Sequence, residues 1–132
     1  MFFKLYGIAL PIFLLIDGVW LGVVAKNFYG KHLGYLMSPT PNWAAAIVFY
    51  LLYIVGLVVL VINPAMNNGG WQEAMWKGAL LGLVGYATYD LTNMATIKDW
   101  PMIVTVVDLI WGTVLSATIS TLTILIAKKL GL

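Results

Sequence analysis

The stretch Met102–Ala127, MIVTVVDLIWGTVLSATISTLTILIA, contains one charged residue, Asp108, in a run of otherwise uncharged and mostly apolar side chains. A helix needs about 20 apolar residues to cross the roughly 30 Å hydrocarbon layer of a membrane. This stretch exceeds that length, and Lys128 and Lys129 follow it directly. It therefore predicts a membrane-spanning helix with a carboxylate inside it.

The whole chain has the same character, with 132 residues of which 62% are hydrophobic and 9% charged. Soluble domains are about 45–50% apolar and about 25% charged, so this chain could not cover a water-facing surface. Its net charge of +2 is too small for tracking nucleic-acid phosphates. The chain has no cysteine, which excludes disulfides and thiolate sites. We expect an integral membrane protein whose main partner is the lipid bilayer.

Three further apolar runs are long enough to span, near Leu5–Ala25, Ala44–Ile62 and Met75–Ile97. The runs are continuous rather than alternating with period two, which argues against a β-barrel. The sequence therefore predicts an all-α, polytopic four-helix bundle, a single transmembrane domain over residues 1–132. An even number of spans places both termini on the same side.

The connections between these spans are short except the first. Asn27–Asn42 is rich in Tyr, Gly and Pro, and we expect it to form a loop that includes an interfacial helical turn. Asn63–Gln72 is expected to be a turn with a proline stop, and Lys98–Pro101 a tight turn. Four tryptophans fall at the expected interfaces, where amphipathic rings anchor a helix: Trp43, Trp71, Trp76 and Trp100.

The lysines favour an orientation only slightly. The side that carries the termini has Lys4, Lys77, Lys128 and Lys129. The opposite side has Lys26, Lys31 and Lys98. By the positive-inside rule this excess indicates cytoplasmic termini. The near balance also permits dual insertion and a homodimer.

Three of the five acidic residues, Asp17, Asp90 and Asp108, fall inside apolar spans. An aspartate at mid-membrane costs at least about 2.5–3.5 kcal/mol on insertion scales. Counting about 1.5 Å per residue from each span's midpoint, they lie roughly 3, 6 and 10 Å toward the face away from the termini. Three acids on three helices thus share one half of the membrane, where they could converge.

The helix neighbours of these acids are polar or aromatic. Residues three or four apart share a helix face, so Tyr86 and Asn93 share a face with Asp90. The spacing of Asp17 to Trp20 repeats in Asp108 to Trp111. Because the first and fourth helices run in opposite directions, each indole N–H would reach the level of the other helix's carboxylate. We hypothesise this reciprocal Asp–Trp pairing.

Two interpretations of these acids remain open. Hydrogen bonds from Trp, Tyr, Asn and Thr to a carboxylic acid can simply hold helices together, at roughly 0.6–2 kcal/mol each. Alternatively, intramembrane ionisable residues mark a pathway or a site. No basic residue lies mid-membrane, so protonation, a bound cation or a cationic ligand would have to satisfy the acids.

Evidence for other chemistry is weak. His32 is the only histidine and lies among lysines in an expected loop, so a histidine-based metal site is not expected. The three aspartates could together bind a hard cation such as Mg²⁺ or Ca²⁺. Gly78, Gly82 and Gly85 form a small-residue face suited to close helix packing. No hydrolase, zincin, P-loop or dinucleotide motif is present.

The segments YDLTNMAT (Tyr89–Thr96), KDWP (Lys98–Pro101) and VDLIWG (Val107–Gly112) resemble one family over essentially the whole chain. It is the family of small bacterial predicted membrane proteins known as domain of unknown function two-one-seven-seven. The resemblance implies a four-helix protein of the bacterial inner membrane, with no assigned activity. It also implies genes set near lipid-modification enzymes, including cyclopropane-type fatty-acid synthases and flavin oxidoreductases.

The sequence leads to one main functional hypothesis and two alternatives. The main one is a protonatable intramembrane site that binds or moves a small cation or an amphipathic ligand, with Asp90 as the titrating group. The first alternative is an enzyme or accessory factor in membrane-lipid (fatty-acyl) modification, with the carboxylates as general acid and base. The second is a purely structural membrane subunit. The sequence identifies no substrate and no cofactor.

Overall fold

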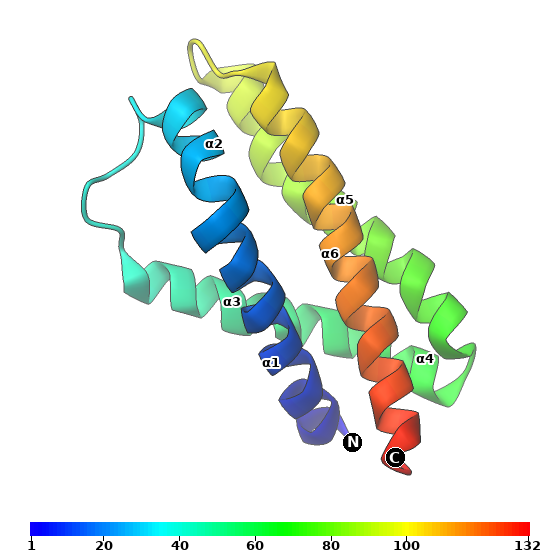
Figure 1. The fold of residues 1–132 in the computed structure, drawn as a ribbon. Coiled ribbons are helices and arrows are strands. Elements are labelled where there is room, and N and C mark those ends of the chain that lie inside the picture. Colours follow the sequence, from blue (N-terminus) through cyan, green and yellow to red (C-terminus); the bar gives the residue numbers. More distant parts are fainter.

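Helices make up nearly the whole chain in the computed structural model, which describes residues 1–132 and contains no strand. In chain order they are α1 (Phe2–Val19), the π-helical turn η1 (Trp20–Val24), α2 (Ala25–Leu33), α3 (Trp43–Leu57), the π-helical turn η2 (Val58–Ile62), α4 (Asn63–Asn67), α5 (Gly70–Thr96) and α6 (Met102–Lys129). They form four helical rods, and both termini lie at the same end of the bundle (Figure 1). The predicted all-α bundle with termini on one side is confirmed.

The first rod is longer than the sequence predicts, because α1, η1 and α2 form one continuous helix over Phe2–Leu33. We expected Lys26 to close the helix and a loop to begin at Asn27. A charged residue at a membrane edge can end the apolar span without ending the helix, and no proline follows until Pro39. The consequence is that Tyr29 lies on a helix.

The second rod, Trp43–Asn67, is also longer than its apolar run. Its start is capped by Asn42, whose Oδ1 accepts a hydrogen bond from the Ala45 N–H at 3.1 Å. Pro64 does not stop the helix, contrary to prediction. It follows directly on η2, where the Asn63 N–H bonds Val58 O five residues back. The regular four-residue ladder is already interrupted there, so the N–H that proline lacks does not end the helix.

Three rods are both long and apolar enough to cross a membrane: Phe2–Leu33, Trp43–Asn67 and Met102–Lys129. Helix α5 has 27 residues, or about 40 Å at 1.5 Å per residue, which is also sufficient length. It is less apolar than the other three because it contains several polar and charged side chains. The fourth crossing therefore stays a prediction.

Helices α5 and α6 run antiparallel, side by side along their length (Figure 1). They meet through small residues. A Cβ added at Gly78 would lie 2.8 Å from Ser116 O, and one added at Gly82 would lie 2.7 Å from Ser116 Cβ. The tight Ile97–Pro101 connection helps to join them, with Asp99 at φ 61°, a conformation that Asp tolerates better than most residues.

The apolar core fills the half of the bundle near the termini. It consists of Leu5, Ala9, Phe13, Ile54, Leu57, Val58, Val61, Ile62, Ala65, Ala74, Leu115, Ile119, Ile124 and Ala127. On α1 these residues recur every four positions, and the next residue of that buried stripe is Asp17. The stripe thus passes from solid apolar packing to a carboxylate, near the middle of the bundle.

The tryptophans expected at interfaces behave differently from one another. Trp43, Trp71 and Trp76 are exposed, as membrane-interface anchors would be. Trp100 is instead buried, and its Nε1–H donates to Thr105 Oγ1 at 3.0 Å. It packs the α5–α6 connection rather than facing a lipid headgroup.

Substituting Gly82 with Ala should lower the thermal stability of the detergent-solubilised protein. The added Cβ has no room against α6, and overpacking of this kind costs about 1–3 kcal/mol. Gly7→Ala is the matched control, because nothing lies within 4 Å of its Cβ position. The melting temperature of each variant would be measured by following the helical circular dichroism signal during heating. Equal melting temperatures for the two variants would contradict the close α5–α6 contact.

Candidate functional site

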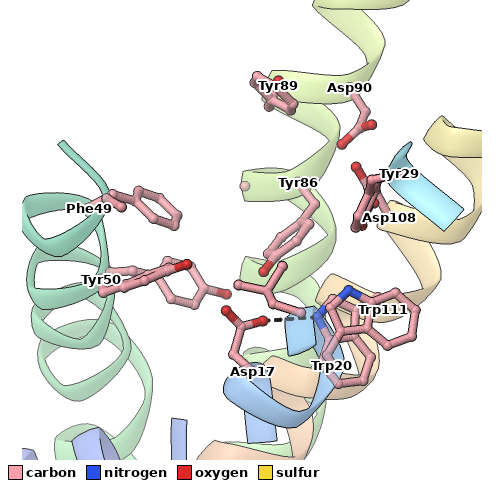
Figure 2. Close-up of a pocket in the computed structure, with 14 residues that line it drawn as sticks. Asp17, Trp20, Tyr29, Phe49, Tyr50, Tyr86, Tyr89, Asp90, Asp108 and Trp111 are labelled. Atoms are coloured by element: carbon pink, nitrogen blue, oxygen red, sulfur yellow. Dashed lines mark hydrogen bonds between the residues drawn. The ribbon is translucent and has the colours of Figure 1, made fainter. Parts of the chain in front are cut away.

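A cavity of about 540 Å³ lies in the half of the bundle away from the termini, among the first rod, α3, α5 and α6 (Figure 2). It is lined by Asp17, Trp20, Leu21, Tyr29, Ala46, Phe49, Tyr50, Tyr53, Gly85, Tyr86, Tyr89, Asp90, Asp108 and Trp111. Six of the seven residues proposed as a site from sequence are among these. Asn93, one turn along α5 from Asp90, is not.

All three intramembrane aspartates line this one cavity, from three different helices. Asp17 and Asp108 are each 7% exposed, and Asp90 is fully buried. No Lys, Arg or His is among the lining residues. The cavity therefore gathers acidic groups without any basic group to balance them.

Asp17 accepts a hydrogen bond from a side chain of α6. The Trp111 Nε1–H donates to Asp17 Oδ1 at 3.3 Å, which is one half of the predicted reciprocal Asp–Trp pairing (Figure 2). The Trp111 ring also stacks on Trp20, with centroids 4.2 Å apart and planes 9° from parallel. The two indoles thus make one flat wall beside the Asp17 carboxylate.

The other half of the predicted pairing is wrong, because Asp108 accepts its hydrogen bond from the Tyr29 hydroxyl and not from Trp20. The Trp20 ring stacks on Trp111 and makes no hydrogen bond to Asp108. Tyr29 was missed in the sequence because it lay in an expected loop. The amphipathic pattern of the stretch AKNFYGKHL, Ala25–Leu33, could have indicated that the helix continues beyond Lys26 and includes Tyr29.

The π-helical turn η1 places Tyr29 on the cavity side of the first rod. Tyr29 follows Asp17 by twelve positions, and at roughly 100° per residue the two would point about 120° apart on an unbroken α-helix. In η1 the Ala25 N–H bonds Trp20 O five residues back, so the turn takes one extra residue. The separation then equals about eleven positions, which leaves only about 20° between them.

Asp90 is the least satisfied polar group of the site. Both of its carboxylate oxygens are buried and neither has a hydrogen-bond partner. Its side chain points toward the Asp108 carboxylate, which lies with Tyr29 on the opposite wall (Figure 2). Two carboxyl groups thus face each other, one bonded to a tyrosine and one without any donor.

Aromatic rings form most of the remaining wall. Tyr53 forms a hydrogen bond with Ser116 of α6, and its ring lies 6.5 Å from the ring of Tyr86 in an edge-on arrangement. Tyr86 packs against the backbone of α6 at Gly112, where a Cβ would clash with the ring. Glycine at this position therefore lets the Tyr86 ring lie between α5 and α6 at the cavity surface.

The aspartates do not form a metal cluster of the usual kind. No group of three acidic, His or Cys side chains lies close enough to hold a metal ion. Asp17 lies apart from the Asp90–Asp108 pair, with Tyr86 between them in Figure 2. A hard-cation site formed by all three aspartates, considered from sequence, is therefore not supported.

The comparison with protein families identifies one relationship. The family described as "Predicted membrane protein (DUF2177)" matches residues 2–125, nearly the whole chain. The chain belongs to this family. No curated protein and no solved structure matches it. The family description gives no activity.

Deleting Val23 should abolish the contact between Tyr29 and Asp108 by converting the π-helical turn into an α-helical one. Tyr29→Phe and Asp108→Asn, combined in a double-mutant cycle of thermal stability, should show a coupling of about 0.6–1.7 kcal/mol in the full-length protein. In the Val23-deleted background the coupling should fall to near zero.

The control for the deletion is Val23→Ala, which keeps the chain length and should keep the coupling. Val23 is 73% exposed, so its side chain has little packing to lose. An unchanged coupling in the deleted background would show that η1 does not set the direction of Tyr29.

Proposed function

We propose that this protein binds a positively charged ligand, a small cation or an amphipathic molecule, in the acidic cavity and exchanges it for a proton. The observation that carries the proposal is Asp90, which is fully buried, lacks any hydrogen-bond partner and faces a second carboxyl group. The ligand-facing acids are Asp17 and Asp108, each slightly exposed in the cavity.

The physical argument begins with the cost of an unpaired buried charge. An isolated carboxylate in a low-dielectric interior is so unfavourable that it is neutralised instead. Two carboxyl groups facing each other are not both charged, since like charges oppose ionisation of the pair. The Asp90–Asp108 pair therefore holds a proton when the cavity is empty. A cation placed beside Asp108 compensates the negative charge in place of the proton, so the proton can leave.

A helix-locking role explains two of the three acids. Asp17 bonds α6 to α1 through Trp111, and Asp108 bonds α6 to α2 through Tyr29. Such bonds contribute to helix association in membranes. Asp90 takes no donor from any other residue, so it can hold α5 to α6 only through a proton shared with Asp108, and such a proton can leave. This supports a site over a purely structural subunit.

The membrane setting we propose is that of the sequence prediction. Helix α5 packs along α6 over its length, so if α6 spans the bilayer, α5 crosses it too (Figure 1). The result is a four-span, multi-pass protein of the bacterial inner membrane with both termini in the cytoplasm. The lysines are nearly balanced between the two sides, which is compatible with dual insertion and a homodimer.

One observation favours a second candidate, the enzyme or accessory factor of lipid modification. Asp90 and Asp108 have unequal surroundings, and paired carboxyl groups in unequal surroundings serve as acid and base in many enzymes. Deleting the gene would then change the fatty-acyl composition of the membrane by mass spectrometry. Purified protein without cation-linked proton exchange, together with that change, would favour this candidate.

Cation addition should release protons from the purified protein. In weakly buffered detergent with a pH-sensitive dye, Na⁺, K⁺, tetramethylammonium and benzyltrimethylammonium are added in turn. At least one of them should release about one proton per bound cation, because one carboxyl of the facing pair loses its proton. Asp90→Asn, nearly isosteric but unable to titrate, should release none.

The matched control is Asp99→Asn, which changes an aspartate outside the cavity, and Asn tolerates its left-handed backbone. This variant should release protons like the unmodified protein. Folded Asp90→Asn with full release would contradict the proposal. Asp90→Asn and Asp108→Asn variants that alter only the melting temperature would leave helix locking as the role of these acids.

Reporter fusions at the C-terminus should place it in the cytoplasm. A reporter active only in the cytoplasm should give signal, and one active only outside should not, because the terminal side carries the excess of lysines. Signal from both reporters would instead support dual insertion. Signal from the outside reporter alone would reverse the proposed orientation.

A further inference from the structure

The cavity wall is predominantly aromatic. Eight of its fourteen lining residues are Trp, Tyr or Phe, and five of those are the tyrosines Tyr29, Tyr50, Tyr53, Tyr86 and Tyr89. Hard inorganic cations take oxygen ligands at about 2.0–2.6 Å, which ring faces do not supply. Organic cations are attracted to ring faces through the ring quadrupole. The wall therefore matches an organic cation better than a metal ion.

The cavity is also larger than an inorganic ion needs. Its 540 Å³ lies within the range of about 300–1,000 Å³ typical of small-molecule sites. A bare ion would leave most of it empty or hydrated, whereas a molecule with an apolar body would fill it.

The acids lie toward two ends of this space. Asp17 lies beside the Trp20–Trp111 stack, the Asp90–Asp108 pair lies further along α5, and the Tyr86 ring is between them (Figure 2). One inorganic ion cannot contact both ends at once, in agreement with the lack of a three-acid cluster. A ligand with its positive charge at one of these ends can place an apolar body along Tyr86 toward the other end.

Two of the residues that line the cavity keep exposed apolar surface. Phe49 on α3 and Leu21 on the first rod line it, and they remain 49% and 44% exposed. Both belong to segments apolar enough to lie in a membrane. A ligand reaching the cavity past these residues comes from the lipid phase, which requires apolar surface on the ligand itself.

We infer that the ligand is an organic ammonium-type cation with an aromatic or alkyl body, taken up from the membrane. This inference rests on the proposed function and narrows its ligand from any cation to this class. The positive charge pairs with Asp17 or Asp108, and the body packs on the aromatic wall.

Benzyltrimethylammonium tests the inference, because neopentylbenzene has the same shape with carbon in place of the charged nitrogen. Binding to the detergent-solubilised protein is followed by tryptophan fluorescence, since Trp20 and Trp111 line the cavity. Benzyltrimethylammonium should give a saturable change. Neopentylbenzene should bind at least about tenfold more weakly, as should tetramethylammonium, which has the charge but no body.

Four substitutions, one of them a control, separate charge from packing. One of Asp17→Asn and Asp108→Asn, at the end that holds the charge, should weaken benzyltrimethylammonium binding about tenfold, and Asp99→Asn, outside the cavity, should not change it. If the first two variants do not fold, Tyr89→Leu serves in their place. Tyr89 is 59% exposed, so its removal spares the fold while taking one ring from the wall.

The outcomes distinguish this inference from the proposed function. Saturable binding of benzyltrimethylammonium that depends on the acids and on Tyr89 supports both. Acid-dependent binding of Na⁺, K⁺ or Mg²⁺ without any benzyltrimethylammonium binding overturns the inference and leaves the proposed function standing. Equal binding of neopentylbenzene overturns the inference as well. No binding of any cation to the folded protein overturns both.

Discussion

The high cost of a carboxylate in an apolar medium governs the arrangement of this protein. Three helices each carry one aspartate within a long apolar stretch, and none of these side chains can face lipid without a large penalty. Bringing all three to one internal space avoids that penalty. The same requirement leaves a cavity in the half of the bundle away from the termini. Carboxyl groups and tyrosine hydroxyls there replace the apolar side chains that fill the half near the termini. The hollow and the acids are therefore one feature.

Sequence reasoning predicted the properties that depend on local composition. Continuous apolar runs located the helices, and counting residues from span midpoints placed Asp17, Asp90 and Asp108 in the same half. The stripe from Tyr86 to Asp90 follows from helical spacing alone, and both residues line the cavity. Close packing was predicted for Gly78, Gly82 and Gly85 from their small size and regular spacing. Helix α6 lies against Gly78 and Gly82, but Gly85 lines the cavity instead, with Tyr53 Cε2 at 3.9 Å from its Cβ position.

The features that sequence reasoning missed depend on tertiary packing. A π-helical turn has no composition of its own, so nothing in WLGVV indicated that the first rod would gain a residue there and turn Tyr29 toward Asp108. Trp20 had the spacing to reach Asp108, but its ring stacks on Trp111 and the Tyr29 hydroxyl donates to that carboxylate instead. Trp100 was expected at an interface because it lies in the Lys98–Pro101 turn, yet the Thr105 hydroxyl in the first turn of α6 gives its N–H a buried partner.

The position of the cavity toward one end of the bundle also gives the protein an electrical asymmetry. Across an energised membrane, moving one elementary charge through the full potential changes its energy by about 2.3 kcal/mol per 100 mV. A cation that reaches the acids from the end away from the termini crosses the smaller part of that field. One that leaves past the solid apolar core crosses the larger part. If the acids bind a cation as proposed, the two parts of the membrane potential act unequally on it, a property set by where the packing is dense and where it is open.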